Sequence, residues 1–175
     1  MHIDINDKVA VERHLWDEIG KGPVGMLGVT GGRPHHTRPM TAIVEPETKQ
    51  LWFFTDKTTE LVQEIASGSR AMFIHQQKDL QACISGQLTQ QHDRGRVDKY
   101  WNAMIAAWFS GGKDDPKLTL LRLECDDAQV WISDAGPAKF VWEIALANAT
   151  KHQPDLMPVT LPSVVMALSR SLYSV

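Results

Sequence analysis

A succession of short strand-like segments, each followed by turn residues, is the feature that most constrains the fold of this chain. Apolar and aromatic residues fill stretches that are too short for typical helices, and Gly, Pro or polar clusters end them. Hairpin-length gaps favour antiparallel pairing, because parallel strands need a long crossover connection. About six strands are expected, over residues 24–30, 35–45, 50–55, 70–75, 80–90 and, in two parts, 118–123 and 129–132.

Other segments have helical periodicity. Asn6 or Asp7 and, further on, Asp93 are typical helix starts, and Gly20 and Gly68 are typical of helix ends. Helices together with antiparallel strands indicate the α+β class, and closure into a barrel is the simplest way to leave no exposed sheet edge. The helices are expected over residues 6–20, 58–66, 93–108 and, near the end, 138–148.

Composition limits the partners of the chain. Its 175 residues are 43% hydrophobic and 22% charged, which is ordinary for a globular domain. A formal charge of -3 gives no general attraction to nucleic acid or to an anionic membrane, so neither is expected as a partner. The two cysteines form no CxxC motif and no export signal is visible, so we expect a cytoplasmic location. The histidines lack the spacing of a zinc site, and no metal is expected.

The chain is expected to hold one domain over residues 1–150 and a C-terminal tail over 151–175. The tail contains Pro154, Pro158 and Pro162. Its last part, residues 163–173, would either form a short helix with an apolar face or have no regular structure. The sequence leaves both alternatives open.

Three segments carry a resemblance through their order and spacing. They are Arg38-Pro39-Met40, the run 51–56 followed by a threonine-led helix, and the aromatic run 100–109 continued by 114–116 and 120–122. Together they resemble the pyridoxamine-phosphate-oxidase-like split-barrel flavoproteins, and more narrowly the general stress protein 26 branch. The resemblance implies a six-stranded antiparallel Greek-key split β-barrel with flanking helices. It also implies a homodimer that binds FMN at its interface, within the domain 1–150.

The resemblance assigns strand residues to parts of the FMN molecule. The dianionic phosphate suits an arginine fork, and Arg38 is expected there. Met40 shares its strand face, and the strand around Met40 and Thr41 is expected to run along the ring. Phe54 and Thr55 are expected at the polar pyrimidine edge of the flavin.

Four further residues are expected near the cofactor. Thr58 and Thr59 open a helix, so their hydroxyls and amides can reach the phosphate, although capping the helix is the alternative. Gln81 aligns with a glutamine that hydrogen-bonds flavin in the oxidase relatives. Trp108 would either cover the flavin or line the dimer seam.

One departure from the family pattern bears on affinity. Members commonly have a basic residue in the first turn of the threonine-led helix, where this chain has Glu60 and Leu61. Loss of one charge-assisted hydrogen bond costs about 1.5–3 kcal/mol, which corresponds to roughly ten- to hundredfold weaker phosphate binding.

The leading hypothesis is therefore an FMN-binding, stress-related flavoprotein with a redox role, such as an FMN-dependent oxidoreductase that uses a nicotinamide donor. No residue is assigned as a catalytic acid or base. The alternative is a non-enzymatic module that binds flavin or another planar cofactor, such as a deazaflavin or haem. Pyridoxamine phosphate oxidase activity is not expected, because the end of the chain, residues 169–175, lacks the Trp- and Arg-containing segment of those oxidases.

Overall fold

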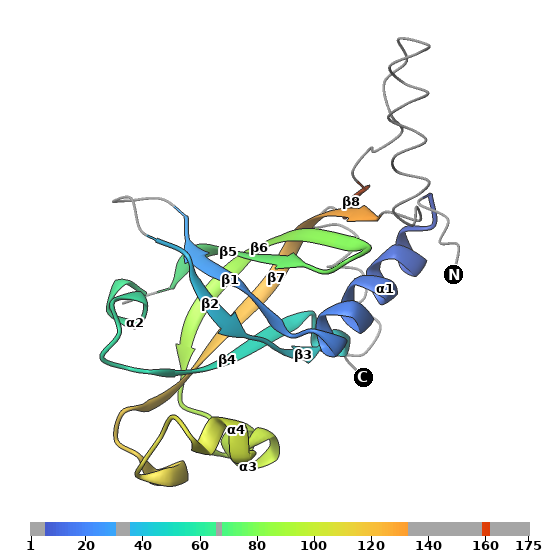
Figure 1. Ribbon diagram of the computed structural model, residues 1–175. Coiled ribbons are helices and arrows are strands. Elements are labelled where there is room, and N and C mark those ends of the chain that lie inside the picture. The colour runs from blue at the N-terminus through green and yellow to red at the C-terminus, as the bar shows by residue number, and fades with distance from the viewer. Residues whose placement is uncertain (1–5, 31–35, 66–67, 133–158, 162–175) are drawn as a thin grey trace, which may run out of the picture.

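One curled antiparallel sheet organises the computed structural model, which describes residues 6–30, 36–65, 68–132 and 159–161 (Figure 1). Its strands are β1 (Val24–Val29), β2 (Arg38–Thr41), β3 (Ile43–Glu45), β4 (Gln50–Asp56), β5 (Ser69–Gln76), β6 (Leu80–Gln91), β7 (Leu118–Ile132) and β8 (Val159–Leu161). They lie in the order β2-β1-β5-β6-β7-β4-β3, and β8 pairs with β7. The consecutive strands β4 to β7 take the spatial order β5-β6-β7-β4, which is a Greek-key arrangement.

The two ends of this strand order are joined by a single residue, Ala42. Residues 38–41 pair with β1 and residues 43–45 pair with β4, so the chain passes from one sheet edge to the other. The Ala42 amide bonds the Pro23 carbonyl at 2.8 Å, which holds the crossing point. The expected single strand 35–45 is thus divided, because its halves find different neighbours. The path has seven strands in place of the expected six, and the antiparallel α+β split-barrel class is confirmed.

Strand β7 is continuous where two separate strands were expected. The polar stretch between the two expected strands contains a β-bulge, at which the register with β6 shifts between Ser85 and Gly86. A side chain at Gly86 would place its Cβ 2.1 Å from the Glu124 carbonyl oxygen, so the close approach of the two backbones requires glycine there. The bulge allows β7 to stay paired with β6 across polar residues that are typical of a turn.

The helices in the described part of the chain are shorter than the periodicity predicts. They are α1 (Lys8–Lys21), α2 (Glu60–Glu64), α3 (Arg94–Tyr100) and α4 (Ala103–Ala106), with short 3-10 turns η1 (Pro46–Thr48) and η2 (Gly112–Asp114). The expected helix 138–148 and the tail segment 163–173 lie outside the described residues, while β8 falls within the expected tail. None of the helices in the described part of the chain has the length and apolarity that a membrane span requires.

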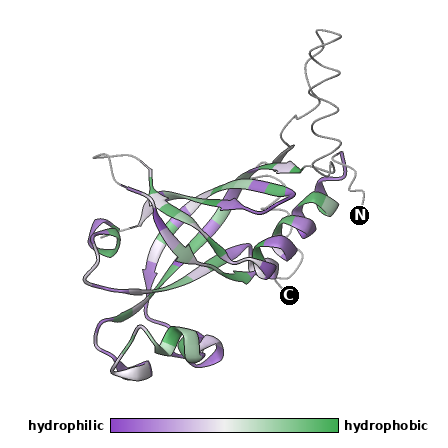
Figure 2. Ribbon diagram, viewed as in Figure 1, coloured by the Kyte–Doolittle hydropathy of each residue, from purple (hydrophilic) through white to green (hydrophobic). Residues whose placement is uncertain are grey.

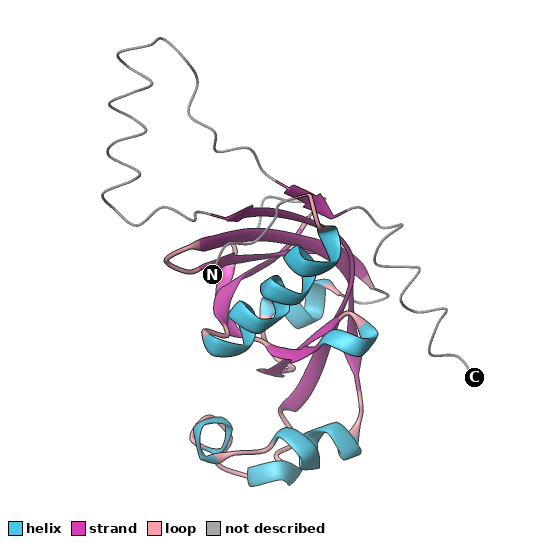
Figure 3. Ribbon diagram, turned by 90° about the vertical axis from the view of Figure 1, so that its right-hand side faces the viewer, coloured by secondary structure: helices cyan, strands magenta, loops and turns pink. Residues whose placement is uncertain are grey.

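Helix α1 lies across the mouth of the curled sheet (Figure 3). Asp7 caps it as expected, by accepting hydrogen bonds from two amides of the first turn. The apolar face of α1 packs into the main hydrophobic core. Along the strands, hydrophobic and hydrophilic residues alternate, so one face of the sheet supplies the rest of this core (Figure 2). The main-core side chains with no solvent exposure include Val11, Leu15, Ile19, Leu27, Leu51, Phe53, Phe73, Leu80, Ile84, Leu88, Leu121 and Leu123.

The prediction of a single helix over residues 93–108 is wrong, because two short helices occupy this segment. Its chain leaves the helical conformation at Trp101, and Asn102 caps α4 by accepting the Ile105 amide at 3.0 Å. An asparagine side chain competes with the helix for backbone amides, and here that competition ends α3. Trp101 turns toward a second small core on the other face of the sheet, around Trp52 and Leu120.

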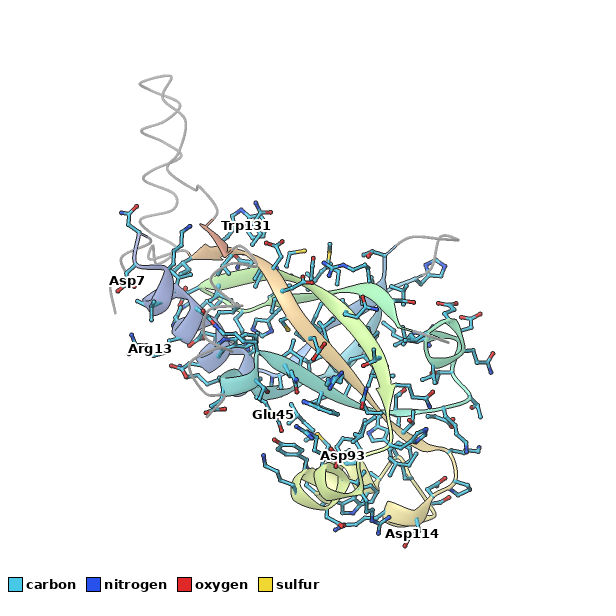
Figure 4. The ribbon with its side chains drawn as sticks, turned by 180° about the vertical axis from the view of Figure 1, so that it is seen from behind. Asp7, Arg13, Glu45, Asp93, Asp114 and Trp131 are labelled. Carbon is cyan, nitrogen blue, oxygen red and sulfur yellow. The ribbon has the colours of Figure 1, made fainter. Side chains whose placement is uncertain are left out.

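Helix α3 is fastened to the sheet through the carboxylate of Glu45 (labelled in Figure 4). The Tyr100 hydroxyl donates to it at 2.6 Å and Arg96 at 3.1 Å, while the Arg96 guanidinium lies 4.1 Å from the centre of the Trp52 ring. Partial burial opposes ionisation of Glu45, but these donors hold its pKa below the ordinary value. The network explains why a helix of seven residues stays docked.

Candidate functional site

Arg38 at the start of β2 reaches the start of α2. Its Nη2 atom lies 3.4 Å from Oε2 of Glu60, the first residue of α2. Arg38 pairs with Leu27 of β1, and its side chain is partly buried, as is that of Met40, whereas Pro39 and Thr41 are exposed. Arg38 and Met40 therefore share the inner face of the strand, as expected from its alternation. The structure thus brings the basic residue and the helix start together.

Asp56 shapes the turn that leads into α2. Its Oδ1 atom accepts both the amide and the hydroxyl of Thr58, each at 2.7 Å. These bonds, the hydroxyl bond foremost, lower the pKa of Asp56. The hydroxyl of Thr58 is therefore already engaged within the turn.

Thr59 occupies the N-cap position of α2 but does not cap it. Its side chain accepts no hydrogen bond from the helix amides. Its Oγ1 atom is buried and has no hydrogen-bond partner. A buried hydroxyl without a partner costs about 1–3 kcal/mol, so this hydroxyl would gain free energy from a new hydrogen-bond partner. The alternative role of Thr59, as a cap of α2 only, is therefore not observed.

The remaining residues expected near the ring lie on two different faces. Thr55 lies on the side of β4 that carries Phe53, toward the barrel interior, because strand side chains alternate. Phe54 points to the opposite side, where its ring meets Trp101 edge-on at 6.2 Å between centroids. The Phe54 side chain therefore does not face the barrel interior. Thr41 is exposed on the outer face of β2.

Gln81 and Trp108 lie away from Arg38 within one chain. Gln81 is in β6, three strand steps from β2 in the sheet order, or about 14 Å at the usual strand spacing. Its side-chain amide donates to the Gln77 carbonyl at 2.9 Å. Trp108 follows α4, which Figure 1 shows apart from α2, and the side chain is 82% exposed.

An apolar row crosses the outer face of the sheet. Strand register places Pro39, Met26, Ile74 and Cys83 side by side on β2, β1, β5 and β6, and we call these four residues the outer row. Met26 is 37% and Ile74 42% exposed, and Val24 beside them is also exposed. The sequence reading did not single out this row, although Val24 and Met26 alternate with core positions. Exposed apolar surface of this kind is typical of an interaction site.

A pocket of about 360 Å³ lies on the other side of the molecule, between the end of β6, α3 and the loop before β7. Its rim is charged, and Figure 4 labels Asp93 and Asp114 there. Arg94 binds Asp114 at 2.6 Å, and Lys113 binds Asp98 at 2.8 Å. None of the residues expected to bind the cofactor lines this pocket, and its basic groups are engaged by neighbouring carboxylates.

Comparison with known proteins gives the chain a family. The sequence profile described as pyridoxamine 5'-phosphate oxidase like matches residues 10–155. A comparison with curated proteins finds no significant match.

Solved structures agree with this profile. A general stress protein 26 from Jannaschia is 30% identical over 88% of this chain and 99% of its own, with a TM-score of 0.72. A general stress family protein from Xanthomonas campestris is 40% identical over 74% and 92%, with a TM-score of 0.69. A general stress FMN/FAD binding protein from Xanthomonas citri is 39% identical over 71% and 90%, with a TM-score of 0.66. This chain therefore belongs to the pyridoxamine 5'-phosphate oxidase-like family, in its general stress protein 26 branch.

Proposed function

We propose that this protein is a cytoplasmic, stress-related flavoprotein that holds FMN at a homodimer interface and has a redox role. The observation that carries the proposal is the meeting of Arg38 with the start of α2, beside the unpartnered hydroxyl of Thr59. The name of the Xanthomonas citri relative, an FMN/FAD binding protein, supports the cofactor class. Flavin, when bound, supplies hydride or electron transfer.

The side chains near the start of α2 have the chemical groups that a flavin phosphate and ring require. The Arg38 guanidinium offers two parallel N–H donors, and its side chain is 33% exposed, so it can turn toward a ligand. The Thr59 hydroxyl would gain the partner that it lacks. The inner face of β2 continues to Met40, whose side chain packs at the edge of the main core and would lie along an apolar ring.

The outer row supports the homodimer. Pro39 belongs to the outer row, and the neighbouring Arg38 faces inward. The outer row and the expected phosphate site therefore lie on opposite faces of the same strand, β2. Gln81 lies on the same outer face as Cys83, two residues further along β6. A second copy seated on the outer row would therefore contact Gln81, which one chain alone does not bring to Arg38.

Titration of the purified protein with FMN, followed by flavin fluorescence and by sedimentation velocity, tests both parts. We expect one FMN per chain and a dimer that Met26→Asp converts to a monomer, because a carboxylate would be buried without a partner in the seam. Val9→Asp, at an exposed apolar position on α1, is the control and should leave the dimer intact. A monomeric wild-type protein would contradict the proposed homodimer. A wild-type protein that does not bind FMN would contradict the proposed cofactor.

A further inference from the structure

The guanidinium that would receive the phosphate already has an anionic partner. Glu60 lies 3.4 Å from Arg38, and its side chain is 81% exposed. The neighbouring Leu61 is only 2% exposed and belongs to the main core, so this position adds no charge to the site. Arg38 is thus paired with Glu60 at the start of α2.

The local charges do not favour a dianion. Arg38 carries one positive charge, and Glu60, the carboxylate beside it, carries one negative charge, so the formal sum of this pair is zero. A phosphate at Arg38 would have to displace the Glu60 carboxylate or lie beside it. Two anions at about 5 Å repel each other by enough, even in water, to weaken binding about tenfold.

From this pairing, and resting on the proposed function, we propose that Glu60 is a specificity-determining residue that competes with the ligand phosphate for Arg38. The chain then binds the flavin ring with little selection for the phosphate. Riboflavin and FMN are both ligands of comparable affinity, and the carboxylate of Glu60 is the reason.

The test compares two flavins and two variants. Wild type, Glu60→Gln and the charge-matched control Glu47→Gln, which changes an exposed glutamate on η1, are titrated with FMN and with riboflavin by flavin fluorescence. We expect wild type to bind the two flavins within about threefold of each other. Glu60→Gln should tighten FMN binding about tenfold and leave riboflavin within about twofold, because only the phosphate meets the carboxylate. Glu47→Gln should change neither affinity.

The salt dependence of the FMN affinity is an independent test of the contact between Arg38 and the phosphate. The FMN affinity of Glu60→Gln should fall with added NaCl more steeply than that of wild type, because its Arg38–phosphate attraction is no longer opposed. Wild type that binds FMN more than about thirtyfold tighter than riboflavin, or an unchanged FMN-to-riboflavin ratio in Glu60→Gln, overturns the role of Glu60 while leaving flavin binding intact. Failure of wild type to bind either flavin overturns the proposed function and this inference with it.

Discussion

Two ion pairs between a glutamate and a basic residue lie in two different parts of this molecule. Glu12 of α1 and Lys49, which follows η1, form a contact in which the side chains are 11% and 4% exposed, and the Trp16 indole also donates to Glu12 at 3.2 Å. The pair of Arg38 and Glu60 is 33% and 81% exposed.

The difference separates stability from binding. A buried pair fixes α1 onto the barrel, because removing one partner would leave an uncompensated charge in the core. An exposed pair contributes little to stability, so its members are free to exchange one another for a ligand. The pair at α1 therefore contributes to stability, whereas under the proposed function the pair at α2 would open to admit a ligand.

The largest expected effect is at the buried pair. Lys49→Met should lower the free energy of unfolding by about 3 kcal/mol, because Glu12 would remain buried without its counter-ion. Urea denaturation followed by tryptophan fluorescence measures this loss. The double variant Glu12→Gln/Lys49→Met should recover part of it. A loss below about 1 kcal/mol in Lys49→Met, the size expected of a surface pair, would erase the contrast between the two ends.

The next effect is at the exposed pair and concerns affinity. Arg38→Ala should weaken FMN binding at least about tenfold, because a charge-assisted bond to the phosphate is lost. Thermal melting of the flavin-free protein should hardly change. The control is Arg13→Ala, an exposed arginine on α1 that Figure 4 shows on the other side of the barrel. Unchanged FMN affinity in Arg38→Ala would mean that this residue does not anchor the phosphate.

A smaller effect comes from His75, which has no solvent exposure. Burial lowers the pKa of His75 below its ordinary value near 6.5. The unfolded chain then binds the proton more readily than the folded one, so stability should fall as the pH drops below about 6.5, by at most about 1.4 kcal/mol per pH unit. The slope should level off below the folded-state pKa.

Urea denaturation at several pH values measures this dependence. His75→Leu should flatten it, since an apolar side chain takes up no proton, whereas His92→Gln at an exposed position should not. A slope that persists unchanged in His75→Leu would assign the acid sensitivity to other groups.

The smallest effects distinguish two adjacent threonines. Thr58→Val should cost about 1 kcal/mol of stability, because its hydroxyl donates to Asp56. Thr59→Val should cost no stability, because its hydroxyl has no partner to lose, yet it should weaken FMN binding by about threefold to tenfold. Thermal melting and FMN titration of both variants separate the two roles. Equal loss of stability in both would show that the Thr59 hydroxyl is paired in solution.

Local patterns in the sequence predict much of this fold. The strands from β4 to β6 and helix α1 follow from alternation, periodicity and caps that each lie within a few residues. The break at Asn102 and the split at Ala42 do not follow in the same way. At both places a helical or strand pattern continues, and a side-chain cap or a second neighbouring strand decides the outcome.

The candidate site was predictable only in part. Similarity to a family pointed to Arg38 and the threonine-led turn, and the structure places these segments together. Their roles toward a cofactor remain predictions. The pairing of Arg38 with Glu60 and the lack of a partner for the Thr59 hydroxyl depend on contacts between parts of the chain that are distant in sequence, which no local pattern reports. The same holds for the outer row, which becomes visible only once four strands are in register.

A crystal structure of the protein with bound FMN tests the central claim most directly. We expect the phosphate within hydrogen-bonding distance of the Arg38 guanidinium and the Thr59 hydroxyl, with the Glu60 carboxylate turned away from Arg38. An FMN phosphate held elsewhere on the chain, with the contact between Arg38 and Glu60 intact, would contradict it.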